Sequence, residues 1–158
     1  MKDRRINGLV NCNQSIEELA MQKRRELTNT MTDFIAAKRT WVKNHYSPET
    51  LHEYETVEGK LKLLDTILKS DWIEKNETVK LQSLGITFGD VIVQDLNFLW
   101  IEVEDEYGID PALILPNTTL ILFPMTMISK RIERGERVDI YELYEALKDD
   151  LNELKNAD

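Results

Sequence analysis

The chain has 158 residues, of which 42% are hydrophobic and 31% are charged, and its formal net charge is −9 at pH 7. This length predicts one domain, residues 1–158, whose core is large enough to fold without disulfides. The single cysteine, Cys12, excludes an internal disulfide. No apolar run reaches the ~18 residues of a membrane helix, and the polar N-terminus lacks the apolar segment of a signal peptide. We therefore expect a cytoplasmic protein with no membrane partner.

The charge is unevenly distributed along the chain. Residues 1–45 contain nine Lys and Arg against five Asp and Glu, whereas residues 46–158 contain eleven against twenty-four. We therefore expect a basic arm (1–45) and an acidic α+β body (46–158). They either attract each other, within one chain or between two copies, or form two solvated surfaces of different sign. The excess of acidic residues disfavours nucleic-acid binding, which needs clustered Lys and Arg to displace counterions.

A long first helix is predicted over residues 16–44. Ser15 and Glu18 have the spacing of a capping box at its start. Apolar residues then recur every seven positions along one face, and further apolar residues lie beside them: the series is Ala20, Leu27, Phe34 and Trp41, flanked by Leu19, Met31, Ile35 and Val42. Because large aromatic side chains in such a stripe must be buried somewhere, we interpret the stripe as core, with partner binding by this helix as the alternative.

Two further helices follow in the sequence. Pro48 stands at the tolerated first position of one that keeps helical spacing to about Lys69, and Gly59 is a weak point that allows its division into two helices. The other opens near Thr78 and extends to about Leu96. Its two glycines, Gly85 and Gly89, stand four residues apart and predict the close approach of another element.

The hydrophobic period changes from helical to alternating at Phe98. Residues 98–107 alternate, which predicts a strand with apolar residues on one face and the acidic residues on the other. Residues 108–111 have turn chemistry, residues 112–115 form a short strand, and residues 118–123 form a third strand. Short connections join antiparallel neighbours, so the sequence predicts a three-stranded meander.

Two helices complete the predicted fold. Pro124 opens a helix that continues to about Arg134 and is closed by Gly135. Asp139 begins a capping box for the final helix, whose apolar stripe continues to Leu154. The predicted class is α+β, with N-terminal helices, a small three-stranded antiparallel β-meander and two C-terminal helices. The apolar stripes of the helices are the natural cover for the sheet.

Three segments of the sequence, residues 81–91, 100–110 and 122–133, resemble a bacterial domain family of unknown function, of the DUF 3806 type. The most recognisable pieces are Glu104-Asp105-Glu106-Tyr107-Gly108 and Met127-Ile128-Ser129-Lys130-Arg131. The resemblance lies mainly within residues 81–136. It implies a bacterial origin and a compact α+β domain, and it brings no established activity.

The densest acidic cluster of the chain lies on the first predicted strand and the turn after it. Its members are Glu102, Glu104, Asp105, Glu106 and Asp110, and no Lys or Arg occurs between Asn97 and Ser129. Alternate residues of a strand project from one face about 7 Å apart, so these carboxylates repel one another unless they are paired, metal-bound or shifted in pKa. Three interpretations stay open: a solvated face that discourages aggregation, pairing with the basic residues after Ser129, and a Mg²⁺ or Ca²⁺ site.

A small basic cluster surrounds Gly135, and it consists of Lys130, Arg131, Arg134 and Arg137. We favour the interpretation that it neutralises the acidic cluster, over the alternative that it binds an anion or an acidic partner. The predicted binding residues are therefore Glu102, Glu104, Asp105, Glu106, Tyr107, Asp110, Lys130 and Arg131.

No catalytic set is recognisable, and we predict no cofactor and no resident metal. His45 and His52 have no third ligand nearby, and the adjacent residues Ser129 and Lys130 point about 100° apart on a helix. The hypothesis is a small acidic protein that binds another protein, most plausibly a basic one, as immunity-like or regulatory modules do. The alternatives are a metal-dependent enzyme that uses the Glu104-Asp105-Glu106 cluster and a homo-oligomer held by the basic first helix.

Overall fold

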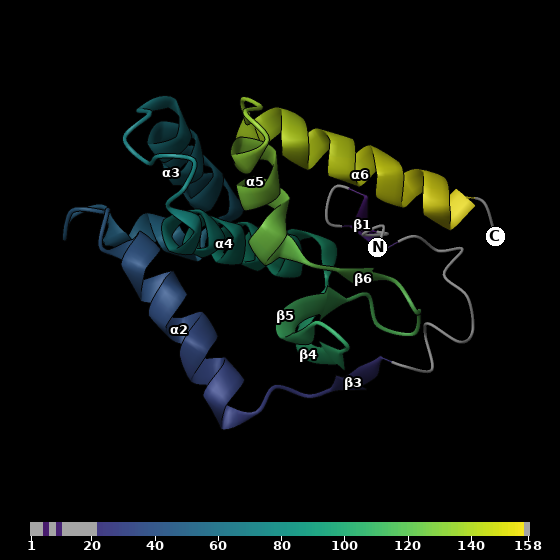
Figure 1. Cartoon of the computed structure of the whole chain (residues 1–158). Coiled ribbons are helices and arrows are strands. Elements are labelled where there is room, and N and C mark those ends of the chain that lie inside the picture. Colours follow the sequence, from purple (N-terminus) through teal and green to yellow (C-terminus); the bar gives the residue numbers. More distant parts are fainter. Residues whose placement is uncertain (1–4, 7–8, 11–21, 157–158) are drawn as a thin grey trace.

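The computed structural model describes residues 5–6, 9–10 and 22–156, and it has the predicted α+β class (Figure 1). In that part of the chain, helices and strands follow one another in the order β1 (Arg5–Ile6), β2 (Leu9–Val10), β3 (Lys23–Arg25), α2 (Asn29–Lys43), the 3₁₀ helix η1 (Leu51–Glu55), α3 (Val57–Lys69), α4 (Thr78–Leu96), β4 (Leu99–Asp105), β5 (Gly108–Ile114), β6 (Ile121–Leu122), α5 (Pro124–Glu133) and α6 (Ile140–Asn156). None of the described helices is both long and apolar enough to cross a membrane.

The described strands form one antiparallel sheet in the order β1-β2-β6-β5-β4-β3. The predicted meander is present as β4, β5 and β6, and it occupies the middle of this larger sheet. On one side β2 pairs with β6, and on the other side β3 pairs with β4. Strands from the N-terminal segment therefore extend the meander at both of its edges.

The first turn of the meander lies three residues earlier than predicted. The β4–β5 hairpin closes at Asp105 and Gly108, and residues 108–111 belong to β5, where Pro111 lies opposite Glu102. Asp105 Oδ1 accepts a hydrogen bond from the backbone N–H of Tyr107 at 2.8 Å, and Gly108 has a φ of +124°. An Asx turn followed by a glycine with positive φ reverses the chain within two residues, so the Gly-Ile-Asp-Pro run is free to form a strand.

The predicted long first helix is wrong over residues 22–28. Lys23–Arg25 is a strand, and α2 begins only at Asn29. The break occurs at Thr28, whose side-chain oxygen accepts from the backbone N–H of Met31 at 3.2 Å and caps the helix. The proposed capping box at Ser15 and Glu18 lies outside the described residues. Over the residues that the structure describes, the basic arm therefore contains the strands β1, β2 and β3, followed by the helix α2.

The second predicted helix is divided in two, as the weak point at Gly59 suggested, but the boundary lies at Thr56. Thr56 Oγ1 accepts from the backbone N–H of Gly59 at 2.9 Å and caps α3. A Cβ on Gly59 would lie 1.9 Å from the carbonyl oxygen of Glu53. Glycine is thus needed in the first turn of α3 because η1 folds back against it.

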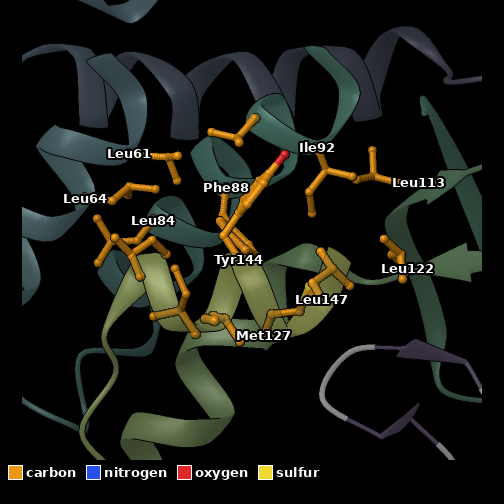
Figure 2. Packing of buried hydrophobic residues seen from close by; sticks show 14 of the residues in the cluster. Leu61, Leu64, Leu84, Phe88, Ile92, Leu113, Leu122, Met127, Tyr144 and Leu147 are labelled. Atoms are coloured by element: carbon orange, nitrogen blue, oxygen red, sulfur yellow. The ribbon is translucent and has the colours of Figure 1, made fainter. Parts of the chain in front are cut away.

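Helix α4 is the centre of the fold, and α2, α3 and α5 pack around it (Figure 1). Figure 2 shows its core: Phe88 meets Tyr144 of α6 edge-to-face, with ring centroids 6.1 Å apart, and Ile92 reaches toward Leu113 and Leu122 of the sheet. The opposite face of the sheet carries a smaller buried cluster of Val103, Ala112, Ile121 and Phe123.

The predicted close approach at the two α4 glycines is confirmed. A Cβ on Gly85 would lie 2.5 Å from the carbonyl oxygen of Pro124, and one on Gly89 would lie 2.5 Å from ring atoms of Trp100. The two C-terminal helices are also confirmed. Asp139 Oδ1 accepts from the backbone N–H groups of residues 141 and 142, as the capping prediction requires.

Candidate functional site

The acidic cluster is divided between a buried anchor and an exposed turn. Glu102 is the buried member, with 1% of its side chain exposed. Its Oε2 accepts from Arg25 Nε at 2.7 Å, and its Oε1 accepts from the backbone N–H of Thr28 at 2.7 Å. The Thr28 N–H and the Arg25 guanidinium hold the pKa of the Glu102 carboxyl below its usual range, against the opposing effect of burial. Glu102 therefore ties β3 and the start of α2 to the sheet.

The remaining acidic residues do not share one site. Glu104 Oε2 accepts from Arg25 Nη1 at 3.2 Å and is partly exposed, while Asp105 stabilises the hairpin turn. Glu106 and Tyr107 are exposed at the tip of that turn, and Asp110 lies on β5 opposite Val103. Within residues 22–156, no three His, Cys, Asp or Glu side chains gather closely enough to hold a metal ion.

The cation that neutralises Glu102 is Arg25, not the expected basic cluster on α5. Arg131 Nη1 donates to the backbone oxygen of Met127 at 2.6 Å, and Arg134 pairs with Glu136 at 3.2 Å. Lys130 lies on the same helix and is half-buried. Sequence reasoning missed Arg25 because it is 77 residues from Glu102. The only available signal was the basic charge of the N-terminal segment.

A second, partly buried carboxylate, which the sequence did not single out, holds the other half of α2. Asp90 of α4 accepts two parallel hydrogen bonds from Arg39, Nε to Oδ2 at 2.7 Å and Nη2 to Oδ1 at 2.8 Å. Tyr54 of η1 donates to Oδ2 at 2.6 Å, and Trp100 Nε1 of β4 donates to Oδ1 at 3.0 Å. Four elements of the chain thus meet at one side chain. Burial and the Asp90 charge raise the pKa of Tyr54, so its hydroxyl stays a donor.

The Asp90 network is structural. An ionised carboxylate has about four lone-pair positions for hydrogen bonds, and all of them are occupied by Arg39, Tyr54 and Trp100. A general base needs a free lone pair aimed at a substrate proton. The carboxylate therefore serves to clamp α2, η1 and β4 onto α4.

α2 turns the ring of Phe34 outward. The stripe predicted as core is only partly buried: α2 buries Ile35, Lys38 and Val42, whereas Phe34 is 41% exposed. Residues 34 and 35 point about 100° apart on a helix, so the buried side of α2 carries members of the stripe that flank the sevenfold series, and Phe34 faces away from it. Sevenfold recurrence alone did not reveal which side faces the core.

Further rings lie at the C-terminal end of α2 and on the loop between α3 and α4: Trp41 is half-buried, and His45 just after the helix is exposed. The ring of His45 lies 4.5 Å from that of Trp41 and stacks on that of Trp72, with centroids 5.4 Å apart and an angle of 20° between the planes. Trp72 is 42% exposed, and Lys80 Nζ lies 5.5 Å from the centroid of its ring. Phe34, Trp41, His45 and Trp72 are called the aromatic patch below.

The aromatic patch is the surface feature that calls most for an explanation. Soluble proteins bury most of their tryptophans, and grouped exposed aromatic residues mark interaction sites more often than isolated ones do. Tryptophan is also among the residues that dominate binding energy at protein interfaces. The two anchors fix α2, which carries Phe34 and Trp41, so these two side chains are presented in one orientation.

Comparison with known proteins identifies a matching family and a solved structure with a similar fold. A family model described as "Domain of unknown function (DUF3806)" matches residues 60–144. No curated protein matches the chain. A crystal structure of a protein from Bacteroides thetaiotaomicron VPI-5482 has a similar fold, with a TM-score of 0.67 and 17% sequence identity, and the similarity covers 81% of this chain and 47% of that one. This chain thus spans less than half the length of that protein, and at this identity the similarity shows the fold alone.

Proposed function

We propose, from the premise that this chain belongs to the family described as a domain of unknown function (DUF3806), that it is a protein-binding module whose contact surface is the aromatic patch. The family resemblance seen in residues 81–136 is confirmed, and the match extends from residue 60 to residue 144. The family brings no activity, so the proposal is supported by the surface of this chain.

The observation that carries the proposal is the group of three neighbouring rings, Trp41, His45 and Trp72, together with the exposed ring of Phe34 two helical turns before Trp41. Flat rings that are already ordered lose little conformational entropy when a partner covers them. The surface combines α2, which precedes the matched family segment, with Trp72, which lies inside it. The matched segment supplies both anchoring carboxylates, Asp90 and Glu102, and α2 supplies Phe34 and Trp41.

The acidic residues of the sheet offer less support for such a surface. Glu102 is buried beneath Arg25, and Glu104 shares the same arginine. The members of that group that face solvent are Glu106 and Tyr107 at the tip of one hairpin. Binding through the aromatic patch and binding through this hairpin tip are therefore separable by substitution.

The test is selection of binders from a random peptide display library on the whole chain. Trp72→Ser removes one ring of the patch, and Tyr107→Ser, which removes an exposed ring at the hairpin tip, is the matched control. We expect peptides that bind the unchanged protein and Tyr107→Ser alike and lose at least ten-fold in affinity on Trp72→Ser. Selected peptides that bind all three proteins equally, or a selection that yields none, would contradict the proposal. Unfolding curves establish that both variants are folded.

Self-association is the second candidate function, because the patch lies on the basic helix of an otherwise acidic chain. A second copy could supply the acidic surface. Size measurement at several salt concentrations distinguishes the two: a dimer held by charge dissociates as salt rises, because screening shortens the range of the attraction. If the protein is a monomer at all salt concentrations, self-association is excluded and the partner is a different protein.

A further inference from the structure

Two lysines are buried among the residues that the structure describes, and their surroundings differ. Lys60 of α3, 4% exposed, donates to Gln94 Oε1 at 2.6 Å and to the Thr56 carbonyl oxygen at 3.3 Å. Lys38 of α2 is 8% exposed, and its Nζ lies 4.9 Å from the centroid of the Phe34 ring. Within the part of the chain that the structure describes, Lys38 has neither a hydrogen-bond acceptor nor a carboxylate partner.

A buried ammonium without an acceptor is unfavourable for the free protein. Transfer of a charge out of water has a large free-energy cost unless an opposite charge or hydrogen bonds compensate it. Burial accordingly lowers the pKa of the Lys38 ammonium, with no neighbouring charge to raise it again. The ring of Phe34 compensates only in part, because a cation–π contact satisfies no N–H donor. A buried donor that the fold leaves unsatisfied is a site for an acceptor from outside.

Lys38 lies inside the aromatic patch. It follows Phe34 by four residues and precedes Trp41 by three, so the three side chains occupy neighbouring positions on one helix surface. Arg39, the next residue, is already neutralised by Asp90. The patch therefore combines exposed aromatic rings with one uncompensated positive charge.

We propose that the aromatic patch binds a segment of a partner protein that carries an Asp or Glu side chain, and that this carboxylate binds Lys38 Nζ between the Phe34 and Trp41 rings. This inference rests on the proposed function and specifies the chemistry of the partner. The positive charge of α2 is the reason for choosing an acidic partner segment. Although the chain as a whole is acidic, α2 contains Lys38 and Lys43, besides Arg39 that Asp90 neutralises, against one acidic residue, Asp33. An acidic segment is complementary to that surface.

The experiment uses the same display selection on the whole chain, followed by synthesis of a selected peptide. We expect the peptides that depend on Trp72 to share an Asp or Glu. Replacement of that residue by Asn or Gln, and separately Lys38→Met in the protein, should each weaken binding at least ten-fold. Lys38→Met keeps the aliphatic stem and removes the charge, so the free variant should melt at a higher temperature than the unchanged protein. Lys62→Met, at an exposed position on α3, is the control and should change neither quantity.

The outcomes separate this inference from the proposed function. Peptides that depend on Trp72 but carry no acidic residue, or bind Lys38→Met with unchanged affinity, overturn the carboxylate site and leave the aromatic patch as a binding surface. A selection without peptides that depend on Trp72 overturns both.

A measurement on the unchanged protein gives an answer even if Lys38→Met does not fold. NMR measures the pKa of Lys38 through the chemical shift of its Cε, the carbon bonded to Nζ, with and without the synthetic peptide. A carboxylate in contact with the ammonium raises this pKa, because the opposite charge favours the protonated form. An unchanged Lys38 pKa in the peptide complex overturns the inference.

Discussion

Arg39 and Asp90 form a bidentate pair, with two parallel N–H···O bonds of 2.7 and 2.8 Å that join α2 to α4. The pair lies at one end of α2, and the Arg25–Glu102 pair lies just before the other end. In both pairs the carboxylate belongs to residues 60–144 and the arginine precedes them. The orientation of α2, and with it the orientation of the aromatic patch, therefore depends on two ionic contacts of long sequence separation.

Asp90→Asn should destabilise the protein strongly. The amide loses the charge that Arg39 faces and replaces one acceptor oxygen with a donor, so at least one of the three partners is left unsatisfied. Removal of one member of a partly buried ion pair is expected to lower the free energy of unfolding by about 3 kcal/mol, as urea titration measures it. Asp65→Asn breaks the exposed pair with Lys69 and should change little. Equal effects of the two substitutions would contradict the structural role of Asp90.

Glu102→Gln should reduce stability in a manner that depends on pH. The folded-state pKa of Glu102 is depressed, so its contribution is fully present above the unfolded-state pKa of about 4.3 and is lost as pH falls through the lower folded-state value. Unfolding titrations at pH 7 and pH 5 should therefore show the same deficit for Glu102→Gln, and the deficit should shrink below about pH 4. The exposed residue Glu106 provides the control, because Glu106→Gln lacks the buried contacts. A deficit that grows in acid would be inconsistent with the Arg25–Thr28 environment.

Gly89→Ala should destabilise the protein although alanine is the better helix former. Helix propensity favours Ala by about 1 kcal/mol, but the new Cβ would lie 2.5 Å from two ring atoms of Trp100 and 3.0 Å from Pro124. The ring must move, and its N–H then loses the hydrogen bond to Asp90. We expect a net loss of about 1–3 kcal/mol and a change in the near-UV circular dichroism of the tryptophans. A gain in stability would show that the ring relocates without cost.

Replacement of Asn97 by alanine should destabilise the protein, whereas replacement by glycine should leave its stability nearly unchanged. It ends α4 with a φ of +62°, in the left-handed region that asparagine and glycine adopt most readily. We expect Asn97→Ala to lower the free energy of unfolding by about 1 kcal/mol and Asn97→Gly to leave it nearly unchanged. Asn152→Ala, at an exposed position inside α6, should have no such cost. Equal losses for alanine and glycine at position 97 would point to a lost side-chain contact instead of backbone strain.

The candidate surface was only partly accessible to sequence reasoning. The sevenfold stripe identified Phe34 and Trp41 and left partner binding by this helix as an alternative, but it could not bring Trp72 to the same place. Trp72 reaches the patch from the loop after α3, by stacking on His45. Lys38 gave no signal, because a lysine within a basic helix looks solvated until the packing of α2 against α4 is known.

What the sequence determined by itself is local. Periodicity, capping residues and glycine spacing suffice for α4, the meander, α5 and α6, because each of these signals acts within a few residues of the chain. Tertiary structure decided which charges are buried and which side of α2 faces solvent. Glu102 meets Arg25 across 77 residues and Asp90 meets Arg39 across 51. No local pattern records such pairings, since they form only after the sheet and helices have brought distant side chains within a few ångströms.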